Sequence, residues 1–400
     1  MASSVQHAAP RIKLAGRLNG IAPSMTLAIN AKAKALKAQG VDVCNFGSGE
    51  PDFDTPLHIK QAAIAALERG ETKYGAVEGI EKLREAIARK LAVENGLYYK
   101  PSQIQVSGGA KQALYNVMMA LTEPGDEVII PAPFWLSYPE MVRLASATPV
   151  IVETPEANRF KLTPELLRAA ITPRTRLLVL ASPSNPTGVM YTPDELAALA
   201  NIIVEHDILV ISDEIYEKLV YGTVPFQSIG SLGEEIFART LTVNGFSKAY
   251  SMTGWRLGYV AGPQAIIDAA NVVQSHSLSN VTTFAQYGGI AALEGDQTPV
   301  EMMRQAFAKR LDVIYNGLAA IPGVTCVRPD GAFYVFPSIA ATGLDSMTFC
   351  QRFLEEEHVA VVPGLSFGSD QHIRFSYATD METIQKGVER LGRFVRRLLK

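Results

Sequence analysis

The chain has 400 residues, of which 48% are hydrophobic and 19% charged, and its formal net charge is −3. This composition is ordinary for a soluble globular protein, and the length predicts roughly two or three domains. No patch is basic enough to suggest a nucleic-acid partner, and no stretch approaches the about 18 consecutive apolar residues of a membrane span.

The first residues of the chain are not expected to be a secretory signal. Residues 1–11 lack the apolar stretch of a secretory signal, and we expect them to form a disordered leader. A helical pattern follows and stops at Gly40, and we expect this helix to pack on a smaller domain. After a short strand, residues 57–69 and 79–95 again predict amphipathic helices.

The middle of the chain alternates short β-branched runs with helical patterns. The runs are QIQVS, DEVIIPAP, RLLVLASP, DILVISDE, RTLTVNG and RLGYVAG. Such alternation predicts a mostly parallel sheet that is covered by helices on both faces.

From about Pro299 the pattern changes to α+β. It predicts a helix over 299–320, a hairpin-like pair of strands around Pro329-Asp330-Gly331, a helix over 346–357, a strand pair and a last helix from Asp380. We therefore predict an α/β fold with four parts. These are the leader at 1–11, an N-terminal part of the small domain at 12–48, a large domain at 49–293 and the rest of the small domain at 294–400.

Residues suited to binding a ligand gather at the ends of the predicted strands, where open α/β sheets bind their ligands. In chain order they are Gly108, Gly109, Ala110, Lys111, Trp135, Asn185, Asp213, Tyr216, Ser247, Lys248 and, further on, Arg256. A helix that opens with glycines favours a phosphate, and a lysine in apolar surroundings has a lowered pKa that makes it nucleophilic. Each feature alone also fits a tight turn, a helix cap or a surface lysine.

Taken together, these groups predict a pyridoxal phosphate site. The acid would keep the pyridine nitrogen protonated so that the ring acts as an electron sink, and the amine would hold the aldehyde as a Schiff base. The six histidines form no HxxxH or HxH pair, and Cys44, Cys326 and Cys350 have no metal-binding spacing. We therefore expect no metal site, and a reducing compartment such as the cytoplasm.

Nine stretches resemble the class I pyridoxal-phosphate aminotransferases when they are taken in combination. They are GEPDFDTP, KYG, GGAKQAL, PAPFWLSYPEM, SPSNPTG, SDEIYE, NGFSKAYSMTGWRLGY, GAFYVFP and RFSYAT. The resemblance covers nearly the whole chain from Leu14 and points to the bacterial, cyanobacterial-like aspartate aminotransferases of the I-beta subgroup. It implies a fold-type I enzyme, with a large domain whose mostly parallel sheet lies between helices and a smaller α+β domain, and a homodimer with shared active sites.

The resemblance also implies a role for each cofactor residue. Lys248 would be the catalytic Schiff-base lysine and proton carrier, and Asp213 would pair with the pyridine nitrogen. Tyr216 and Asn185 would bond the ring hydroxyl oxygen, and Trp135 would stack on the ring. Arg256 with the backbone of 109–111 would hold the phosphate, and Tyr74 would reach the phosphate of the neighbouring subunit.

The resemblance also implies that two cationic side chains bind the substrate. Arg374 would clamp the α-carboxylate, for which its fork of donors is well matched, with help from the Gly49 backbone, Trp135 and Asn185. Lys111 would bind the distal carboxylate, because the segment QSHSLSNVT lacks the arginine that other aspartate enzymes supply from a partner subunit. A cis bond before Pro186 is also expected.

Two positions depart from the pattern of the family. Gly245 stands where many relatives carry a phosphate-binding serine, and the sequence leaves open whether Ser247 replaces it. Ala22 stands where prephenate-using relatives carry a basic residue, which weakens a prephenate activity without excluding it.

We therefore expect an aspartate aminotransferase that moves an amino group reversibly, in a ping-pong reaction, between L-aspartate and 2-oxoglutarate, giving oxaloacetate and L-glutamate. An aromatic, kynurenine or prephenate aminotransferase of the same fold stays open, although a buried unpaired Lys111 would disfavour an apolar ring. A lyase that uses the same cofactor also stays open, because only product analysis separates it from a transferase. A regulator that kept the fold is a further alternative, but no added domain or basic patch supports it.

Overall fold

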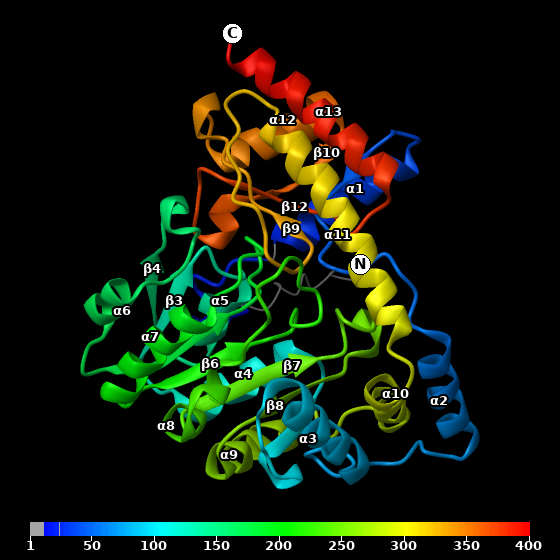
Figure 1. Ribbon diagram of the computed structural model, residues 1–400, viewed down its shortest axis with the longest axis vertical. Helices are drawn as coiled ribbons and strands as arrows, with labels where there is room; N and C mark the ends of the chain where they lie inside the picture. Colours follow the sequence, from blue (N-terminus) through cyan, green and yellow to red (C-terminus); the bar gives the residue numbers. More distant parts are fainter. Residues whose placement is uncertain (1–11, 24) are drawn as a thin grey trace, which may run out of the picture.

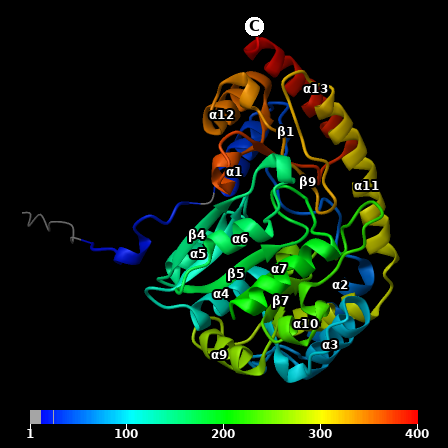
Figure 2. The ribbon, with the colours of Figure 1, turned by 60° about the vertical axis from the view of Figure 1, so that its left-hand side comes forward.

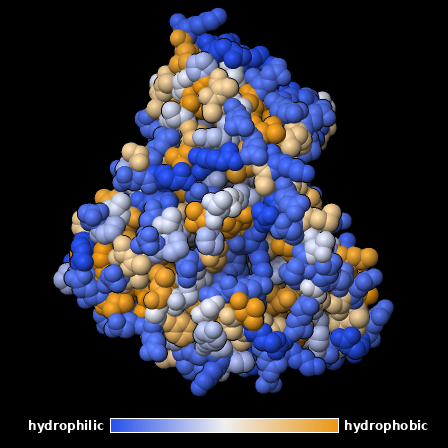
Figure 3. Space-filling model, viewed as in Figure 1, coloured by the Kyte–Doolittle hydropathy of each residue, from blue (hydrophilic) through white to orange (hydrophobic). Residues whose placement is uncertain are grey.

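The computed structural model describes residues 12–23 and 25–400, so the predicted leader at 1–11 lies outside the described residues. The described chain forms a large body around a seven-stranded sheet and a smaller body beside it (Figure 1). Within these ranges, no helix combines the length and the hydropathy that crossing a membrane requires. On the face shown in Figure 3, hydrophilic side chains predominate and apolar ones lie scattered between them.

The central sheet has the strand order β2-β8-β7-β6-β5-β3-β4. Its strands are β2 (Ile104–Ser107), β3 (Glu127–Ala132), β4 (Thr148–Glu153), β5 (Thr175–Ala181), β6 (Leu209–Asp213), β7 (Thr240–Gly245) and β8 (Gly258–Ala261). Strands β3 to β7 run parallel to one another, and β8 runs antiparallel to both of its neighbours. The prediction of a mostly parallel sheet is confirmed.

Helices cover both faces of this sheet. They are α2 (Leu57–Glu68), α3 (Glu81–Asn95), α4 (Ala110–Leu121), α5 (Ser137–Leu144), α6 (Pro164–Ala170), α7 (Pro193–Glu205), α8 (Glu234–Phe237), α9 (Gln264–Ser275) and α10 (Thr283–Glu294). One apolar cluster joins α4, α5 and α9 to the strands, and a second joins α6, α7 and α8 to them. Because both faces are packed, the central strands are apolar almost throughout, and these continuous apolar runs made the strands recognisable in the sequence.

The small body is assembled from both ends of the chain. It contains α1 (Met25–Ala38), α11 (Thr298–Ala319), α12 (Ser346–Glu357), α13 (Met381–Leu398), β1 (Cys44–Asn45), β9 (Tyr334–Val335), β10 (Val359–Ala360), β11 (Val362–Pro363) and β12 (Ile373–Ser376). Strand β1 pairs in parallel with β10, and α1 packs on β10 and β11, as predicted for the N-terminal helix. Helix α11 runs along one side of the molecule past both bodies (Figure 2). This packing supports a division near residues 48 and 293, which stays a proposal.

Two sequence expectations differ from the structure. Strand β4 was not predicted, because its short apolar run at 149–152 begins with a proline and, at the edge of the sheet, is only partly buried. The predicted hairpin around Pro329-Asp330-Gly331 is wrong. Its two arms share one antiparallel bridge, between Thr325 and Ser338, and Gly331 bridges Val220 of the large body. The turn is bonded to the large body instead, because the N–H groups of Asp330 and Gly331 both donate to the Gly188 carbonyl oxygen.

The core of the small body leads to a stability prediction. A Cβ atom at Gly387 of α13 would lie 2.3 Å from the ring of the fully buried Phe46. We expect Gly387→Ala to lower the free energy of unfolding by about 1–3 kcal/mol, because overpacking forces side chains out of their preferred positions. Thermal or urea unfolding measures the change.

The same helix offers a matched control. At Gly392 the nearest atoms to an added Cβ are 3.4 Å away and belong to the flexible Arg396 side chain. Gly392→Ala is therefore expected to be neutral or to stabilise the helix by up to about 1 kcal/mol. Equal effects of the two substitutions would contradict the packing described for Phe46.

Candidate active site

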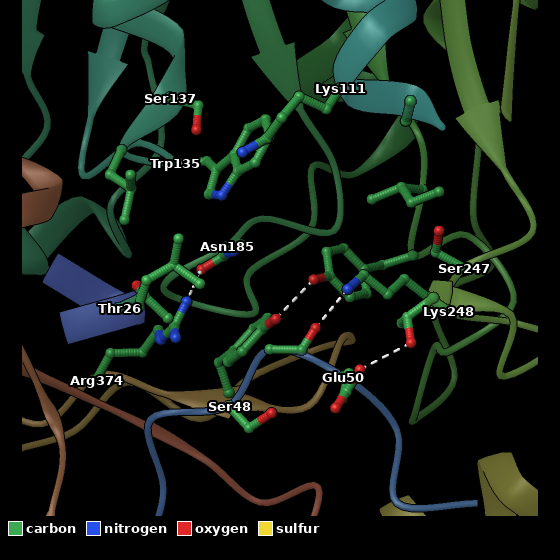
Figure 4. A pocket seen from close by; sticks show the side chains of 18 of the residues that line it. Thr26, Ser48, Glu50, Lys111, Trp135, Ser137, Asn185, Ser247, Lys248 and Arg374 are labelled. Atoms are coloured by element: carbon green, nitrogen blue, oxygen red, sulfur yellow. Dashed lines mark hydrogen bonds between the residues drawn. The ribbon is translucent and has the colours of Figure 1, made fainter. Parts of the chain in front are cut away.

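A cavity of about 620 Å³ lies where the carboxyl ends of β5, β6 and β7 face the small body. The predicted residues that line it are Gly49, Ala110, Lys111, Trp135, Asn185, Asp213, Tyr216, Lys248, Arg256 and Arg374. Gly109 lies directly behind the lining at the start of α4, and Tyr74 lies away from the cavity with 93% of its surface exposed. The structure thus brings together all the predicted site residues except Tyr74 (Figure 4).

Asp213 ends strand β6 with its carboxylate buried at the wall of the cavity. The hydroxyl of Tyr138 donates to its Oδ2 atom at 2.6 Å, and the Ile215 N–H donates to Oδ1 at 3.3 Å. Burial raises the pKa of Asp213, while the bond from Tyr138 opposes that rise. Among the described residues no cation lies within 4.0 Å of this carboxylate, so as an anion it lacks a direct counter-charge.

Tyr216 follows Asp213 on the same turn and points its hydroxyl at the cavity. This hydroxyl lies 2.7 Å from the hydroxyl of Tyr334, which comes from β9 of the small body. Burial, reinforced by Tyr334, raises the pKa of Tyr216 well above its usual value. Tyr216 is therefore a neutral hydrogen-bond donor at any physiological pH.

Lys248 follows β7 and lines the cavity. Its Nζ atom donates a hydrogen bond to the carbonyl oxygen of Gly49 (Figure 4). Burial, and secondly the positive charge of Arg374, lowers the pKa of Lys248 to about 8. A sizeable fraction of the amine is therefore unprotonated near neutral pH, as a nucleophile or a proton carrier requires.

The start of helix α4 is built to receive an anion. Gly109 occupies the N-cap with a φ of 90° and supplies no side-chain cap, so the N–H groups of Ala110 and Lys111 have no partner in the described part of the chain. A Cβ at Gly109 would lie 2.6 Å from the guanidinium of Arg256, which shows how closely this cation approaches the helix. Free N–H groups, the helix dipole and an arginine together suit a phosphate.

Arg374 on β12 is buried, with 1% of its surface exposed. Nη1 donates to Asn185 Oδ1 at 2.8 Å and Nη2 donates to the Gly47 carbonyl oxygen at 3.0 Å. The guanidinium lies 4.6 Å from the ring centre of Tyr334, and its Nε atom has no partner among the described residues. A buried planar cation without an acidic partner is well suited to clamp a carboxylate from a ligand.

Lys111 places a second cation in the cavity. Its Nζ atom lies 4.9 Å from the ring centre of Trp135, and neither a hydrogen bond nor an ion pair holds it within the described ranges. Burial, and secondly the charge of Arg256, lowers the pKa of Lys111. The side chain is thus free to meet a second anionic group of a ligand.

Two site residues were missed by the sequence analysis. Tyr138 supplies the hydroxyl bond to Asp213 and lies one helical turn after Trp135, against which it packs edge to face at 5.4 Å. Tyr334 lies between Tyr216 and Arg374. Both tyrosines stand in apolar segments of the sequence. A buried phenol hydroxyl needs a hydrogen-bond partner, and this requirement could have identified them as candidate site residues.

The structure also bears on the departure at Gly245 and on the expected cis bond. A side chain at Gly245 would lie 3.0 Å from the Gly258 Cα atom of the neighbouring strand, so a serine there would be crowded. Ser247 lines the cavity beside Lys248. The expected cis bond between Asn185 and Pro186 is present.

Comparison with known proteins gives a consistent result. The family model for aminotransferases of class I and II matches residues 41–391. An aspartate aminotransferase of Geobacillus stearothermophilus is 52% identical over 389 residues, covering 96% of this chain and 99% of the relative. An aspartate/prephenate aminotransferase of Cereibacter sphaeroides is 47% identical, covering 95% and 98% of the two chains. The structure of the aspartate aminotransferase from Thermus thermophilus with maleate has a TM-score of 0.92 at 47% identity, covering 96% of this chain and 99% of that chain.

The lowered pKa of Lys248 leads to a labelling prediction. When cofactor-free protein meets pyridoxal phosphate and borohydride traps the product, we expect Lys248 to be labelled first. Because only the unprotonated amine attacks an aldehyde, the trapping rate should rise with pH and level off above about pH 8. Peptide mass spectrometry at a series of pH values measures both the site and the rate.

The other lysines are internal controls for this experiment. A fully solvated lysine amine in a model peptide has a pKa of about 10.4, so the labelling of an amine without the burial of Lys248 should still be rising at about pH 10. Labelling spread over the surface lysines, or a Lys248 rate that keeps rising in the same way, would contradict the environment described for Lys248.

Proposed function

Since the chain belongs to the class I and II aminotransferase family, we propose that it is a pyridoxal-phosphate-dependent aspartate aminotransferase. It would move an amino group reversibly, in a ping-pong reaction, between L-aspartate and 2-oxoglutarate, giving oxaloacetate and L-glutamate. One observation carries the choice of substrate. Arg374 and Lys111 both face the cavity, and neither has an acidic partner among the described residues, so together they match a dicarboxylate.

The residues of the cavity fit pyridoxal phosphate. Asp213 offers a buried carboxylate without a cation, which suits the pyridine nitrogen, and the open start of α4 with Arg256 suits the phosphate. Trp135 would cover the ring, while Tyr216 and Asn185 would bond its hydroxyl oxygen. When bound, the cofactor supplies a protonated ring that accepts the electron pair left on the substrate's α-carbon.

The side chains of this chain would orient the substrate and move its proton. Arg374 would hold the α-carboxylate and Lys111 the distal one, which turns the Cα–H bond toward Lys248. The neutral amine of Lys248 would take this α-proton, and the carbonyl oxygen of Gly49 would hold the resulting ammonium. Because Arg374 belongs to the small body, binding of the carboxylate would draw that body over the cavity and exclude water.

The assembly and the compartment are parts of the same proposal. We propose a homodimer in which Tyr74 reaches the phosphate of the neighbouring subunit, and the exposure of Tyr74 away from its own cavity supports this role. The cytoplasm is the proposed compartment, and the three free thiols at Cys44, Cys326 and Cys350 support it.

A second candidate is prephenate transamination by the same site. The relative from Cereibacter sphaeroides that carries this double activity in its name is 47% identical and supports the alternative. Ala22 opposes it, since the family resemblance implies a basic residue at this position in enzymes that use prephenate.

Paired activity measurements test the proposal. The purified protein with pyridoxal phosphate should form oxaloacetate from aspartate and 2-oxoglutarate, and a malate dehydrogenase assay measures this product. We expect kcat/KM for aspartate to exceed that for phenylalanine by at least about tenfold, because only aspartate satisfies both cations. Lys248→Ala should remove nearly all turnover.

Three outcomes would contradict this assignment. A preference for phenylalanine would move the chain to the aromatic aminotransferases, and a preference for prephenate would favour the second candidate. Release of ammonia without an oxo-acid acceptor would identify a lyase.

The role of Lys111 is tested separately. Lys111→Met keeps the apolar stem over Trp135 but removes the charge. A hydrogen bond to a charged group contributes about 1.5–3 kcal/mol, so kcat/KM for aspartate should fall by about 10- to 100-fold. Phenylalanine is the control substrate, and its kcat/KM should hold or rise. An equal fall for both substrates would show that Lys111 does not bind the distal carboxylate.

A further inference from the structure

The turn after β6 carries two carboxylates that the proposed mechanism does not use. Asp213 and Tyr216 line the cavity, whereas Glu214 and Glu217 are buried on the other side of the same turn and do not line it. Burying two acids is costly unless each has partners. Their contacts therefore indicate what the turn is fastened to.

Glu217 is held by three side chains from two other elements. It forms an ion pair with Lys90 of α3, whose side chain is 5% exposed against 8% for Glu217. Asn95, at the end of α3, donates to Oε2 at 2.6 Å, and Asn244 of β7 donates to Oε1 at 2.7 Å. The carboxylate thus fixes the turn to a helix and to the neighbouring strand at once.

The contact with Asn244 links the turn to the segment that carries the catalytic lysine. Asn244 also accepts a hydrogen bond from the Gly245 N–H at 2.7 Å, at the end of β7. Lys248 follows three residues later. Glu217 therefore adds a side-chain connection between the turn after β6, which carries Asp213 and Tyr216, and the end of β7, which precedes Lys248.

Of the two buried acids, Glu217 is the one whose negative charge is stabilised by a neighbouring cation. Burial would raise the pKa of Glu217, but the ion pair with Lys90 and the bond from Asn95 lower it below the usual value. Burial, and secondly the charge of Glu217, raises the pKa of Glu214 to about 7, and its oxygens accept bonds from Ser212 at 2.9 Å and Ser228 at 2.6 Å. Glu94 and Lys218 form a further pair at the edge, at 2.7 Å.

Stability alone is a weak reason for such an arrangement, because apolar residues of similar volume often replace a buried ion pair without loss. We propose that Glu217 is a positioning residue that sets the spacing between Asp213 and Lys248, so that the acid and the amine meet opposite ends of one cofactor ring. The inference rests on the proposed function in one respect, which is that the cavity binds pyridoxal phosphate. Displacements of about 1 Å at such groups change rates strongly.

Two variants separate positioning from folding. Asn244→Ala removes the link between Glu217 and β7, together with the acceptor of the Gly245 N–H, and leaves the ion pair of Glu217 with Lys90 intact. The double variant Lys90→Met with Glu217→Leu replaces the whole pair by apolar side chains, so that neither member of the pair is left without the other. Glu127→Gln is the matched control, because Glu127 is a 9% exposed carboxylate paired with Arg174 at the other end of β3 from the cavity.

The readouts are the dissociation constant of pyridoxal phosphate and the pH midpoint at which the visible absorption of the bound cofactor shifts. We expect both variants to raise the dissociation constant by about tenfold and to move the midpoint by at least about half a pH unit. The value of kcat for aspartate should fall by about tenfold, while KM changes less than about twofold because Arg374 and Lys111 are untouched. The control should change none of these values.

Unchanged cofactor binding and midpoint in both variants, with only a lower melting temperature, would overturn the positioning role while leaving the proposed function intact. If instead the unaltered protein bound no cofactor at Lys248, the proposed function and this inference would both fall. The two failures are distinguishable because the binding readouts need no amino-acid substrate.

Discussion

The site is organised around the buried carboxylate of Asp213. It ends a strand inside the protein, accepts hydrogen bonds from Tyr138 and from its own turn, and has no ion pair among the described residues. An isolated buried anion is unfavourable, so its stable partner is a cation that enters the cavity. The protonated ring nitrogen of pyridoxal phosphate is the partner that we propose, and the positions of the other groups follow from where that ring would then lie.

Parallel strands bring these groups to one edge of the sheet. Ala181 at the end of β5 pairs with Asp213 of β6, which in turn pairs with Val243 of β7. Asn185, Asp213 and Lys248 therefore leave three adjacent strands at nearly the same level. The antiparallel β8 lies beside β7, and its Gly258 has no side chain, which allows the start of α4 to approach closely. The N–H groups proposed to hold the phosphate therefore lie at the same edge of the sheet.

Features of the fold that follow from a local sequence pattern were predictable, and features that depend on contacts between distant residues were not. The buried strands and the residues at their ends were predictable because a sheet covered on both faces needs apolar runs that end at a ligand edge. The edge strand β4 and the contact between Tyr216 and Tyr334 were not. The apolar run of β4 is short, begins with a proline and is only partly buried, and the two tyrosines are 118 positions apart. The ion pair of Lys90 with Glu217 joins residues 127 positions apart and leaves no local pattern. The role of Tyr74 depends on a second subunit and stays a prediction.

The measurement that tests the central claim most directly is nitrogen-15 magnetic resonance of ring-labelled pyridoxal phosphate bound to the protein. The account predicts that the ring nitrogen stays protonated from about pH 6 to about pH 9 in the unaltered protein, because the anion of Asp213 stabilises the positive ring. Asp213→Asn should lose this signal over the same range while Lys248 still binds the cofactor. An unprotonated ring nitrogen at neutral pH in the unaltered protein, or a protonated one in the variant, would contradict the account.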